Sequence, residues 1–309
     1  MLLDILLIII GITLVLVGAD RLTEGASALA RRFGVPEIVI GLTIVACGTS
    51  APELFVSLMS ALNGTPDMAV GNVVGSNIMN AMLIVGCAAM VAPMTISHST
   101  VKKDIPFSVA ASLLLILLTI DSALGRIDGT VLIVGFAVFM AYTLWQAKGN
   151  KAEQPVESKP QNPWLSILYI VLGLAGLVFG SDFFVDSASN VAAQLGVSES
   201  VIGLTIVAGG TSLPELATSV VAARKGQSAI AIGNVIGSNV FNILLILGVT
   251  SVISPLQLEG ITMLDMGVMM GSIAMVWLFS FTRYSVERWE GALLVVGYLA
   301  YLGWLLSNV

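Results

Sequence analysis

Charged residues are scarce in this sequence. Of its 309 residues only 10% are Asp, Glu, Lys or Arg, whereas soluble domains carry about 25%. Hydrophobic residues make up 57% of the chain, and the mean hydropathy is +0.98. This composition excludes an ordinary soluble domain, and the net charge of −6 gives no indication of nucleic-acid binding. Apolar runs of about 18 or more residues recur, so we expect an all-α membrane protein whose first partner is the lipid bilayer.

Side chains that bind transition metals are almost absent as well. The sequence has two cysteines, Cys47 and Cys87, and a single histidine, His98. Both cysteines lie in apolar segments, without the spacing of a metal site or a disulfide framework. We expect no cofactor, no enzymatic activity and no obligate protein partner.

What the sequence does contain is an internal repeat. Residues 41–93 align without a gap with residues 203–255, at an offset of 203 − 41 = 162, and 27 of the 53 aligned pairs are identical. Two motifs recur: GLTIVACGTSAPEL (41–54) returns as GLTIVAGGTSLPEL (203–216), and GNVVGSNIMN (71–80) returns as GNVIGSNVFN (233–242). The chain is therefore two copies of one structural unit.

A polar segment separates the two copies. We place the first unit at 1–147, the second at 164–309, and between them a linker at 148–163 that contains three prolines. Each unit divides into about five helices, of which we expect the second and the seventh to be broken. The expected helices are 2–27, 36–61, 68–92, 104–121 and 128–147, then 164–189, 198–223, 230–254, 266–283 and 290–308.

Five helices is an odd number, so the second unit must enter the membrane from the opposite side. Inverted repeats of this kind are typical of secondary transporters. With ten helices, twelve of the thirteen basic residues fall on one side of the membrane, and only Arg126 falls on the other. The twelve are Arg21, Arg31, Arg32, Lys102, Lys103, Lys148, Lys151, Lys159, Arg224, Lys225, Arg283 and Arg288. This bias predicts a cytoplasmic linker and two outside termini. The cytoplasmic (inner) membrane of a prokaryote is the location implied by the family resemblance described below.

Glu53 and Glu215 are equivalent residues of the repeat, and each lies deep within an apolar helix. A carboxylate at that depth costs about 2.5–3.5 kcal/mol on insertion scales, so two related ones indicate a functional site. Two carboxylates that approach one another repel, and they need a cation or a proton between them. Structural glutamates, bonded as neutral acids, are the alternative interpretation.

Neutral oxygen atoms surround these glutamates in the sequence. Pro52 and Pro214 follow glycine-containing turns, so we expect broken helices with free backbone carbonyls at Ala46, Thr49, Ala208 and Thr211. Side-chain oxygens come from Thr49, Ser50, Ser76, Asn80, Thr211, Ser212, Ser238 and Asn242, and from Asn77 and Asn239, which are equally suited to helix packing. An all-oxygen set favours hard cations such as Ca²⁺ and Na⁺.

The paired GTS-x-PE and GN-x-x-GSN-x-x-N segments resemble the α-repeats of sodium/calcium exchangers, in the calcium/cation antiporter superfamily. The likeness covers nearly the whole chain and is greatest to the short prokaryotic members. It implies that Glu53 and Glu215 bridge a central Ca²⁺, completed by the carbonyls of Thr49 and Thr211. The flanking Na⁺ sites that it implies use Ala46, Ser50 and Ser238 on one side, and Ala208, Ser212 and Ser76 on the other, with Asn80 and Asn242 lining the middle.

The resemblance further implies exchange of Na⁺ for Ca²⁺ by alternating access, with the first and sixth helices sliding as a pair and Ca²⁺ extruded. Several relatives, among them potassium-dependent ones, carry an aspartate where this chain has Asn242. The asparagine argues against co-transport of K⁺. A proton-coupled Ca²⁺/cation antiporter and a cation channel remain alternatives.

Overall fold

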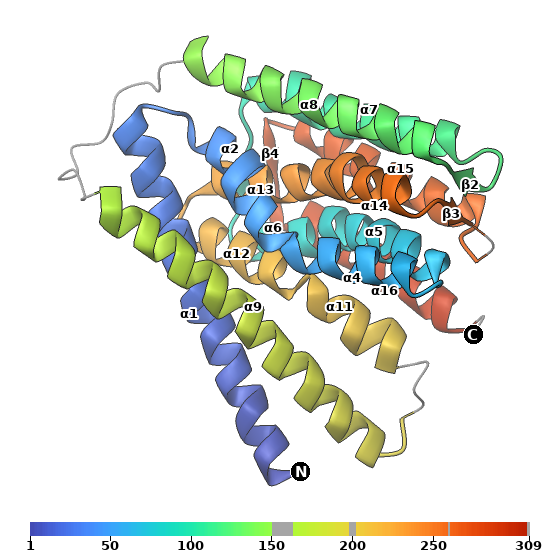
Figure 1. The fold of residues 1–309 in the computed structure, drawn as a ribbon. Helices are drawn as coiled ribbons and strands as arrows, with labels where there is room; N and C mark the ends of the chain where they lie inside the picture. The colour runs from blue at the N-terminus through green and yellow to red at the C-terminus, as the bar shows by residue number, and fades with distance from the viewer. Residues whose placement is uncertain (150–162, 198–201, 259, 308–309) are drawn as a thin grey trace.

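The computed structural model describes residues 1–149, 163–197, 202–258 and 260–307 (Figure 1). Its first half contains α1 Leu2–Phe33, α2 Glu37–Ile40, η1 Gly41–Val45, α3 Ala46–Thr49, α4 Ala51–Leu62, α5 Pro66–Met79, η2 Asn80–Ile84, α6 Val85–Val91, β1 Met94–Thr95, η3 Thr100–Asp104, α7 Ile105–Leu118, β2 Ala123–Leu124 and α8 Arg126–Gly149, where η denotes a π-helical turn. Its second half contains α9 Pro163–Gln194, η4 Gly203–Val207, α11 Ala208–Thr211, α12 Leu213–Arg224, α13 Ser228–Val240, η5 Phe241–Ile246, α14 Leu247–Ile253, β3 Leu256–Gln257, α15 Met263–Ser280, β4 Ser285–Val286 and α16 Arg288–Ser307.

The described residues contain seven helices that are long and apolar enough to cross a membrane. Two further spans result if each of two bent helix pairs counts as one, which makes nine. The expected helix at 104–121 corresponds to η3 and α7, and α7 alone has only 14 residues, too few to cross the hydrocarbon core as an α-helix. The membrane-spanning character of the chain is confirmed, and a count of ten stays a prediction.

Two expectations about the first helix are wrong. Helix α1 continues to Phe33 instead of ending near 27, because its C-cap residue Gly34 adopts the left-handed conformation at φ 63° that closes a helix. Arg31 and Arg32 lie in its last turn, where the helix dipole favours cations. The count of basic residues by side assigns Arg21 to the loop after the first helix, but Arg21 lies within α1, and its guanidinium donates a 3.0 Å hydrogen bond to Glu24.

Helices α1 and α9 pack along one another and extend together from the rest of the molecule (Figure 1). Glycines seven positions apart form their contact. A Cβ atom on Gly18 would lie 2.7 Å from the carbonyl oxygen of Gly173, and one on Gly11 would lie 2.7 Å from that of Gly180. Small residues allow such close approach of membrane helices. Gly11 meets Gly180, whereas Gly18, further along α1, meets Gly173, which lies earlier in α9. The two helices are therefore antiparallel.

Two small β-pairs were not expected in an all-α chain. Strand β1 pairs with β4, and β2 pairs with β3, both antiparallel. The repeat offset of 162 converts one pair into the other. Met94 pairs with Val286, and the equivalent positions, 94 + 162 = 256 and 286 − 162 = 124, are Leu256 and Leu124, which also pair with one another. Each pair therefore joins one strand from each half, and the offset found in the sequence is also a symmetry of the fold.

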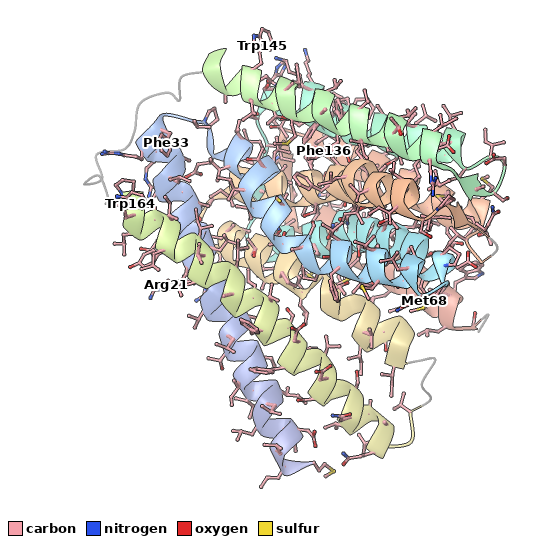
Figure 2. All side chains as sticks on the ribbon, in the orientation of Figure 1. Arg21, Phe33, Met68, Phe136, Trp145 and Trp164 are labelled. Carbon is pink, nitrogen blue, oxygen red and sulfur yellow. The ribbon has the colours of Figure 1, made fainter. Side chains whose placement is uncertain are left out.

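The outer surface is apolar, as lipid contact requires. Figure 2 shows Trp145 near the end of α8 and Trp164 near the start of α9, on the side where the two halves are connected. Both tryptophans are exposed, at 69% and 75%. Tryptophans gather at the boundary between hydrocarbon and water, so these two indicate where the bilayer ends on that side.

Candidate functional site

The repeated motif GTS-x-PE breaks its helix in both halves. Helices α3 and α4 meet at Ser50 with a bend of 46°, and the equivalent segments meet at Ser212 with a bend of 57°. Both serines have nearly the same backbone angles, φ −85° and ψ 8° for Ser50 and φ −91° and ψ 6° for Ser212. A proline two residues later occupies the first turn of the next helix, where its missing N–H is tolerated. The expected breaks are confirmed.

Each break places a glutamate in the first turn of a helix. Glu53 is the third residue of α4 and Glu215 is the third residue of α12, and their exposed fractions are 1% and 0%. The positive end of the helix dipole stabilises a carboxylate there. In the part of the chain that the structure describes, neither glutamate forms an ion pair with a basic residue.

The two halves exchange hydrogen bonds at these glutamates. The hydroxyl of Ser50 donates to Oε1 of Glu215 at 3.0 Å, and the hydroxyl of Ser212 donates to Oε1 of Glu53 at 3.2 Å. The spacing Ser-x-x-Glu is that of a local capping box, in which each serine would cap its own helix. Neither serine caps its own helix with its side chain here, because the hydroxyl bonds to the opposite half.

Two more serines of the expected site join this arrangement. Ser238 donates to Oε1 of Glu215 at 3.4 Å, and Ser76 receives a hydrogen bond of 3.3 Å from Ser212. All four of the expected serine ligands are buried next to the glutamates: Ser50, Ser76, Ser212 and Ser238. The structure therefore brings together residues that lie far apart in the sequence.

The sequence predicts a free backbone carbonyl at Ala46, but this carbonyl is hydrogen-bonded in the structure. It accepts hydrogen bonds from the backbone N–H of Ser50 at 3.0 Å and from the hydroxyl of Thr49 at 3.4 Å, because the helix continues through that turn before it bends. Ala208 and Thr211 form the equivalent turn, α11, in the second half.

Asn72 and Asn234 support the site, and sequence reasoning missed them. The side-chain amide of Asn72 donates to the carbonyl of Glu53 at 3.2 Å and to the hydroxyl of Ser57 at 2.9 Å. Asn234 forms the equivalent bonds to Glu215 and Ser219 at 3.3 and 3.0 Å. Their identity in both copies of the GN-x-x-GSN motif was the available signal. Asn234 also accepts a 3.0 Å bond from the hydroxyl of Thr49.

Four asparagines form a second network between the halves. Asn80 donates its amide to Oδ1 of Asn239 at 3.1 Å, and Asn242 donates to Oδ1 of Asn77 at 3.1 Å. Asn77 and Asn239 therefore hold the other two asparagines in place. The side-chain amides of Asn80 and Asn242 each donate a hydrogen bond, while their Oδ1 atoms accept none from the residues that the structure describes.

Four buried oxygens at the centre lack a hydrogen-bond donor within the described residues. They are Oε2 of Glu53, Oε2 of Glu215, Oδ1 of Asn80 and Oδ1 of Asn242. The four are related in pairs by the repeat. Buried polar atoms are normally satisfied, and a buried carboxylate without a counter-charge is costly. Carboxylate and amide oxygens are ligands for hard cations, so a transported cation could bind here.

The sequence as a whole was compared with known proteins. The sodium/calcium exchanger protein family matches residues 3–145 and again residues 165–307, one match for each half. The chain belongs to the sodium/calcium exchanger family. It is thereby a multi-pass membrane transporter of a cation antiporter family.

Individual proteins also resemble the chain over nearly its full length. The putative antiporter CaxA of Alkalimonas amylolytica is 37% identical and is aligned over 100% of both chains. The inner membrane protein YrbG of Escherichia coli (strain K12) is 36% identical, over 99% of this chain and 97% of its own length. A solved structure of the sodium-calcium exchanger NCX_Mj, soaked with Na⁺ and Ca²⁺, is 32% identical and superimposes with a TM-score of 0.86, covering 97% of this chain and 98% of that chain.

Proposed function

We propose that the chain is an antiporter that exchanges Na⁺ for Ca²⁺ across the cytoplasmic membrane. The observation that carries the proposal is the set of four buried oxygens on Glu53, Glu215, Asn80 and Asn242 that have no hydrogen-bond donor among the described residues. Membership of the sodium/calcium exchanger family supports it.

Charge balance explains why two glutamates suit this exchange. Two buried carboxylates carry two negative charges, which one Ca²⁺ neutralises and which more than one Na⁺ is needed to match. Desolvation raises the energy of the two carboxylates when no cation is bound. The site therefore switches readily from one side of the membrane to the other only when cations occupy it. Ca²⁺ and Na⁺ therefore bind to the site in turn and never together. Binding of either one allows the conformational change that exposes the site to the other side of the membrane.

The ligands that we assign are those of the two broken helices and their partners. Glu53, Glu215 and the carbonyls of Thr49 and Thr211 bind Ca²⁺. The Na⁺ ligands are Ser50 and Ser238 on one side and Ala208, Ser212 and Ser76 on the other, with Asn80 and Asn242 lining the space between; Ala46 would join the first set only if its carbonyl gave up the 3.4 Å bond from the Thr49 hydroxyl. The hydrogen bonds between Ser50 and Glu215 and between Ser212 and Glu53 support this grouping.

The proposed topology has ten spans in two inverted units, 1–147 and 164–309. Thr100–Leu118 then crosses as one span with a π-helical start. The linker lies in the cytoplasm and both termini lie outside, as the basic residues indicate. Ca²⁺ is extruded, and if three Na⁺ enter per Ca²⁺, a potential of 100 mV adds roughly 2.3 kcal/mol to each cycle.

Asn242 supports exchange without K⁺, because an aspartate there would add a third buried charge. Coupling to protons instead of Na⁺ is the second candidate, since a pair of buried carboxylates can also be discharged by protonation. Calcium uptake into proteoliposomes tests the two. Uptake that depends on a pre-loaded Na⁺ gradient supports Na⁺ coupling, whereas uptake that ignores Na⁺ and follows a pH gradient overturns it.

A further inference from the structure

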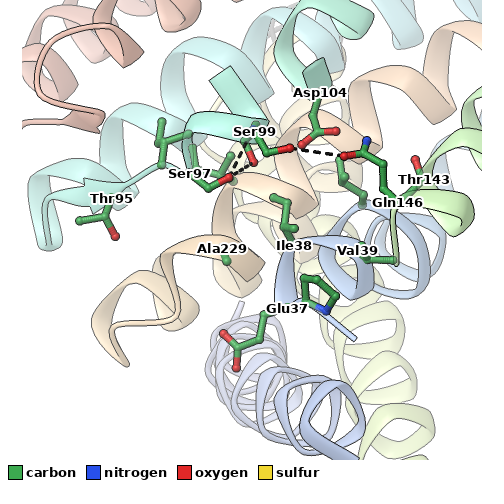
Figure 3. A pocket seen from close by; sticks show the side chains of 15 residues that line it. Glu37, Ile38, Val39, Thr95, Ser97, Ser99, Asp104, Thr143, Gln146 and Ala229 are labelled. Atoms are coloured by element: carbon green, nitrogen blue, oxygen red, sulfur yellow. Dashed lines mark hydrogen bonds between the residues drawn. The ribbon is translucent and has the colours of Figure 1, made fainter. Parts of the chain in front are cut away.

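A cavity with a largely apolar lining and one polar end lies away from the transport-site residues, where α2, the segment after β1, the end of α8 and the start of α13 meet (Figure 3). Its volume is about 250 Å³. It lies on the side of the molecule from which α8 leads into the linker, which is cytoplasmic in the orientation proposed above. The cavity adjoins Leu42, four residues before Ala46, so it lies beside the helix that leads to the transport site.

Oxygen atoms form the polar end of this cavity. Asp104 is 6% exposed, and Figure 3 shows its carboxylate beside Ser99 and Gln146. The hydroxyl of Ser99 donates to Oε1 of Gln146 at 3.3 Å, and Ser97 lies 3.0 Å from the hydroxyl of Thr100. These bonds hold the neutral oxygens around Asp104 in place.

Thr143 provides an independent indication that this cavity binds a ligand. It lines the same cavity from α8, is 1% exposed, and its hydroxyl has no hydrogen-bond partner among the described residues. A buried hydroxyl without a partner costs about 1–3 kcal/mol. A bound cation close to it would supply the missing interaction.

Charge selects the ligand. The other acidic group at the cavity, Glu37, is already engaged: its carboxylate is hydrogen-bonded by Ser27 and lies 3.8 Å from Arg31, and Figure 3 shows it directed away from Asp104. Among the lining residues that the structure describes there is no Lys, Arg or His. The Asp104 carboxylate interacts with Thr100 and Gln146 and with the charge of Lys103, but it forms no ion pair within 4.0 Å among the described residues. One such carboxylate among neutral oxygens suits a hard monovalent cation.

The repeat shows that the carboxylate of Asp104 has no acidic counterpart in the other half. Adding the offset of 162 converts Asp104 into Met266, Ser99 into Ile261 and Thr143 into Leu305, whereas Thr100, Ser97 and Gln146 become the polar residues Thr262, Glu259 and Asn308. Met266, Ile261 and Thr262 line a cavity at the equivalent place in the second half. The transport site, in contrast, repeats its glutamates, serines and asparagines in both halves, so the symmetry of the exchange gives no reason for a carboxylate at position 104.

We propose that this cavity binds one Na⁺ from the cytoplasm, held by the Asp104 carboxylate, the Thr143 hydroxyl and the neutral oxygens of Ser97, Ser99 and Gln146. The cytoplasmic side rests on the proposed function. The ion would connect the segment after β1 to α8, at a place beside α2. This place is separate from the site of the ions that are exchanged.

Equilibrium binding of ²²Na⁺ to the purified protein tests the site. The background is the double variant Glu53→Gln/Glu215→Gln, which removes the transport carboxylates. We expect it to bind one Na⁺ per chain, and we expect Asp104→Asn in that background to weaken binding by at least about tenfold, the equivalent of 1.4 kcal/mol. Thr143→Val, which keeps the size of the side chain, should weaken it severalfold. Asp121→Asn, at an exposed carboxylate outside the cavity, should leave it unchanged.

Three results would overturn the proposal: no saturable Na⁺ binding in the double variant, unchanged affinity after Asp104→Asn and Thr143→Val, or equally tight binding of Ca²⁺ in place of Na⁺. Misfolding is checked separately, since Asp104→Asn with intact glutamates must still bind ⁴⁵Ca²⁺. If the double variant still exchanges Ca²⁺, the proposed transport site fails, while the comparison of Asp104→Asn with its background still decides the Na⁺ site.

Discussion

Ser50 and Glu215 lie 165 positions apart in the sequence, yet the hydroxyl of Ser50 donates a 3.0 Å hydrogen bond to Oε1 of Glu215. The reciprocal bond runs from Ser212 to Glu53. Each half therefore helps to orient the carboxylate of the other half. A relative movement of the halves changes the surroundings of both glutamates together, as an alternating-access site requires.

The glutamates provide the first prediction. Glu53→Gln and Glu215→Gln should each lower Ca²⁺ exchange by at least about a hundredfold, since removing one partner from a buried charged site costs about 3–5 kcal/mol. The measurement is ⁴⁵Ca²⁺ uptake into proteoliposomes. The control is Glu24→Gln, at a carboxylate near the surface that pairs with Arg21. Full exchange by Glu53→Gln or Glu215→Gln would show that the glutamate in question does not bind the transported ion.

The reciprocal serines provide the second. Ser50→Ala and Ser212→Ala should weaken Ca²⁺ and Na⁺ binding to similar extents, each by about tenfold or more, because a hydrogen bond to a charged group contributes about 1.5–3 kcal/mol. Half-saturating concentrations in flux assays measure the change. Ser272→Ala is a matched control, since Ser272 is equally buried but bonds to the backbone of its own helix at Met269. An effect in only one of the two serine variants contradicts the symmetry of the site.

A third prediction concerns the seam between α1 and α9. Gly18→Val should destabilise the protein by about 1–3 kcal/mol or more, because its Cβ would lie 2.7 Å from the backbone oxygen of Gly173. The apparent melting temperature in detergent measures this loss. Gly271→Ala on α15 is the control, since a Cβ there meets nothing within 4 Å. An unchanged melting temperature for Gly18→Val would mean that α1 and α9 separate easily.

A fourth prediction concerns the charge at the centre. Asn242→Asp adds a third carboxylate to a buried site that has two, so its exchange should come to require an additional cation, K⁺ or a proton. The assay is Na⁺-driven Ca²⁺ uptake with and without K⁺, at two pH values. Asn63→Asp, at an exposed loop position, should leave the ion requirement unchanged. Asn242→Asp exchange that is indifferent to both K⁺ and pH would show that Asn242 lies outside the ion-binding space.

Much of this arrangement could be predicted from the sequence, because the repeat and the apolar runs are both strong signals. Glu53 and Glu215 were found by their depth in apolar segments, and the helix breaks at Ser50 and Ser212 by the prolines that follow. The sequence misplaces the end of α1, because Arg31 and Arg32 resemble loop residues, whereas they lie exposed in the last turn of the helix.

Other features depend on contacts that no local pattern reveals. The Ser-x-x-Glu spacing predicts bonds within one helix, but the serines bond across the halves because a second helix start lies opposite. From the sequence alone, Asn72 and Asn234 fit a role in helix packing as well as a role at the site. Only their hydrogen bonds to the backbone carbonyls of Glu53 and Glu215 show that they support the site. The π-helical turns η1 and η2, and their equivalents in the second half, adjoin the site without any sequence signature.

The central claim is that Na⁺ and Ca²⁺ compete for the pair Glu53 and Glu215. The most direct measurement is ⁴⁵Ca²⁺ uptake into proteoliposomes loaded with Na⁺ and diluted into Na⁺-free medium, repeated with equal Na⁺ on both sides and with an imposed pH gradient alone. We predict rapid uptake only with the Na⁺ gradient, lost in Glu53→Gln and Glu215→Gln. Uptake that persists at equal Na⁺, or in either variant, would contradict the account.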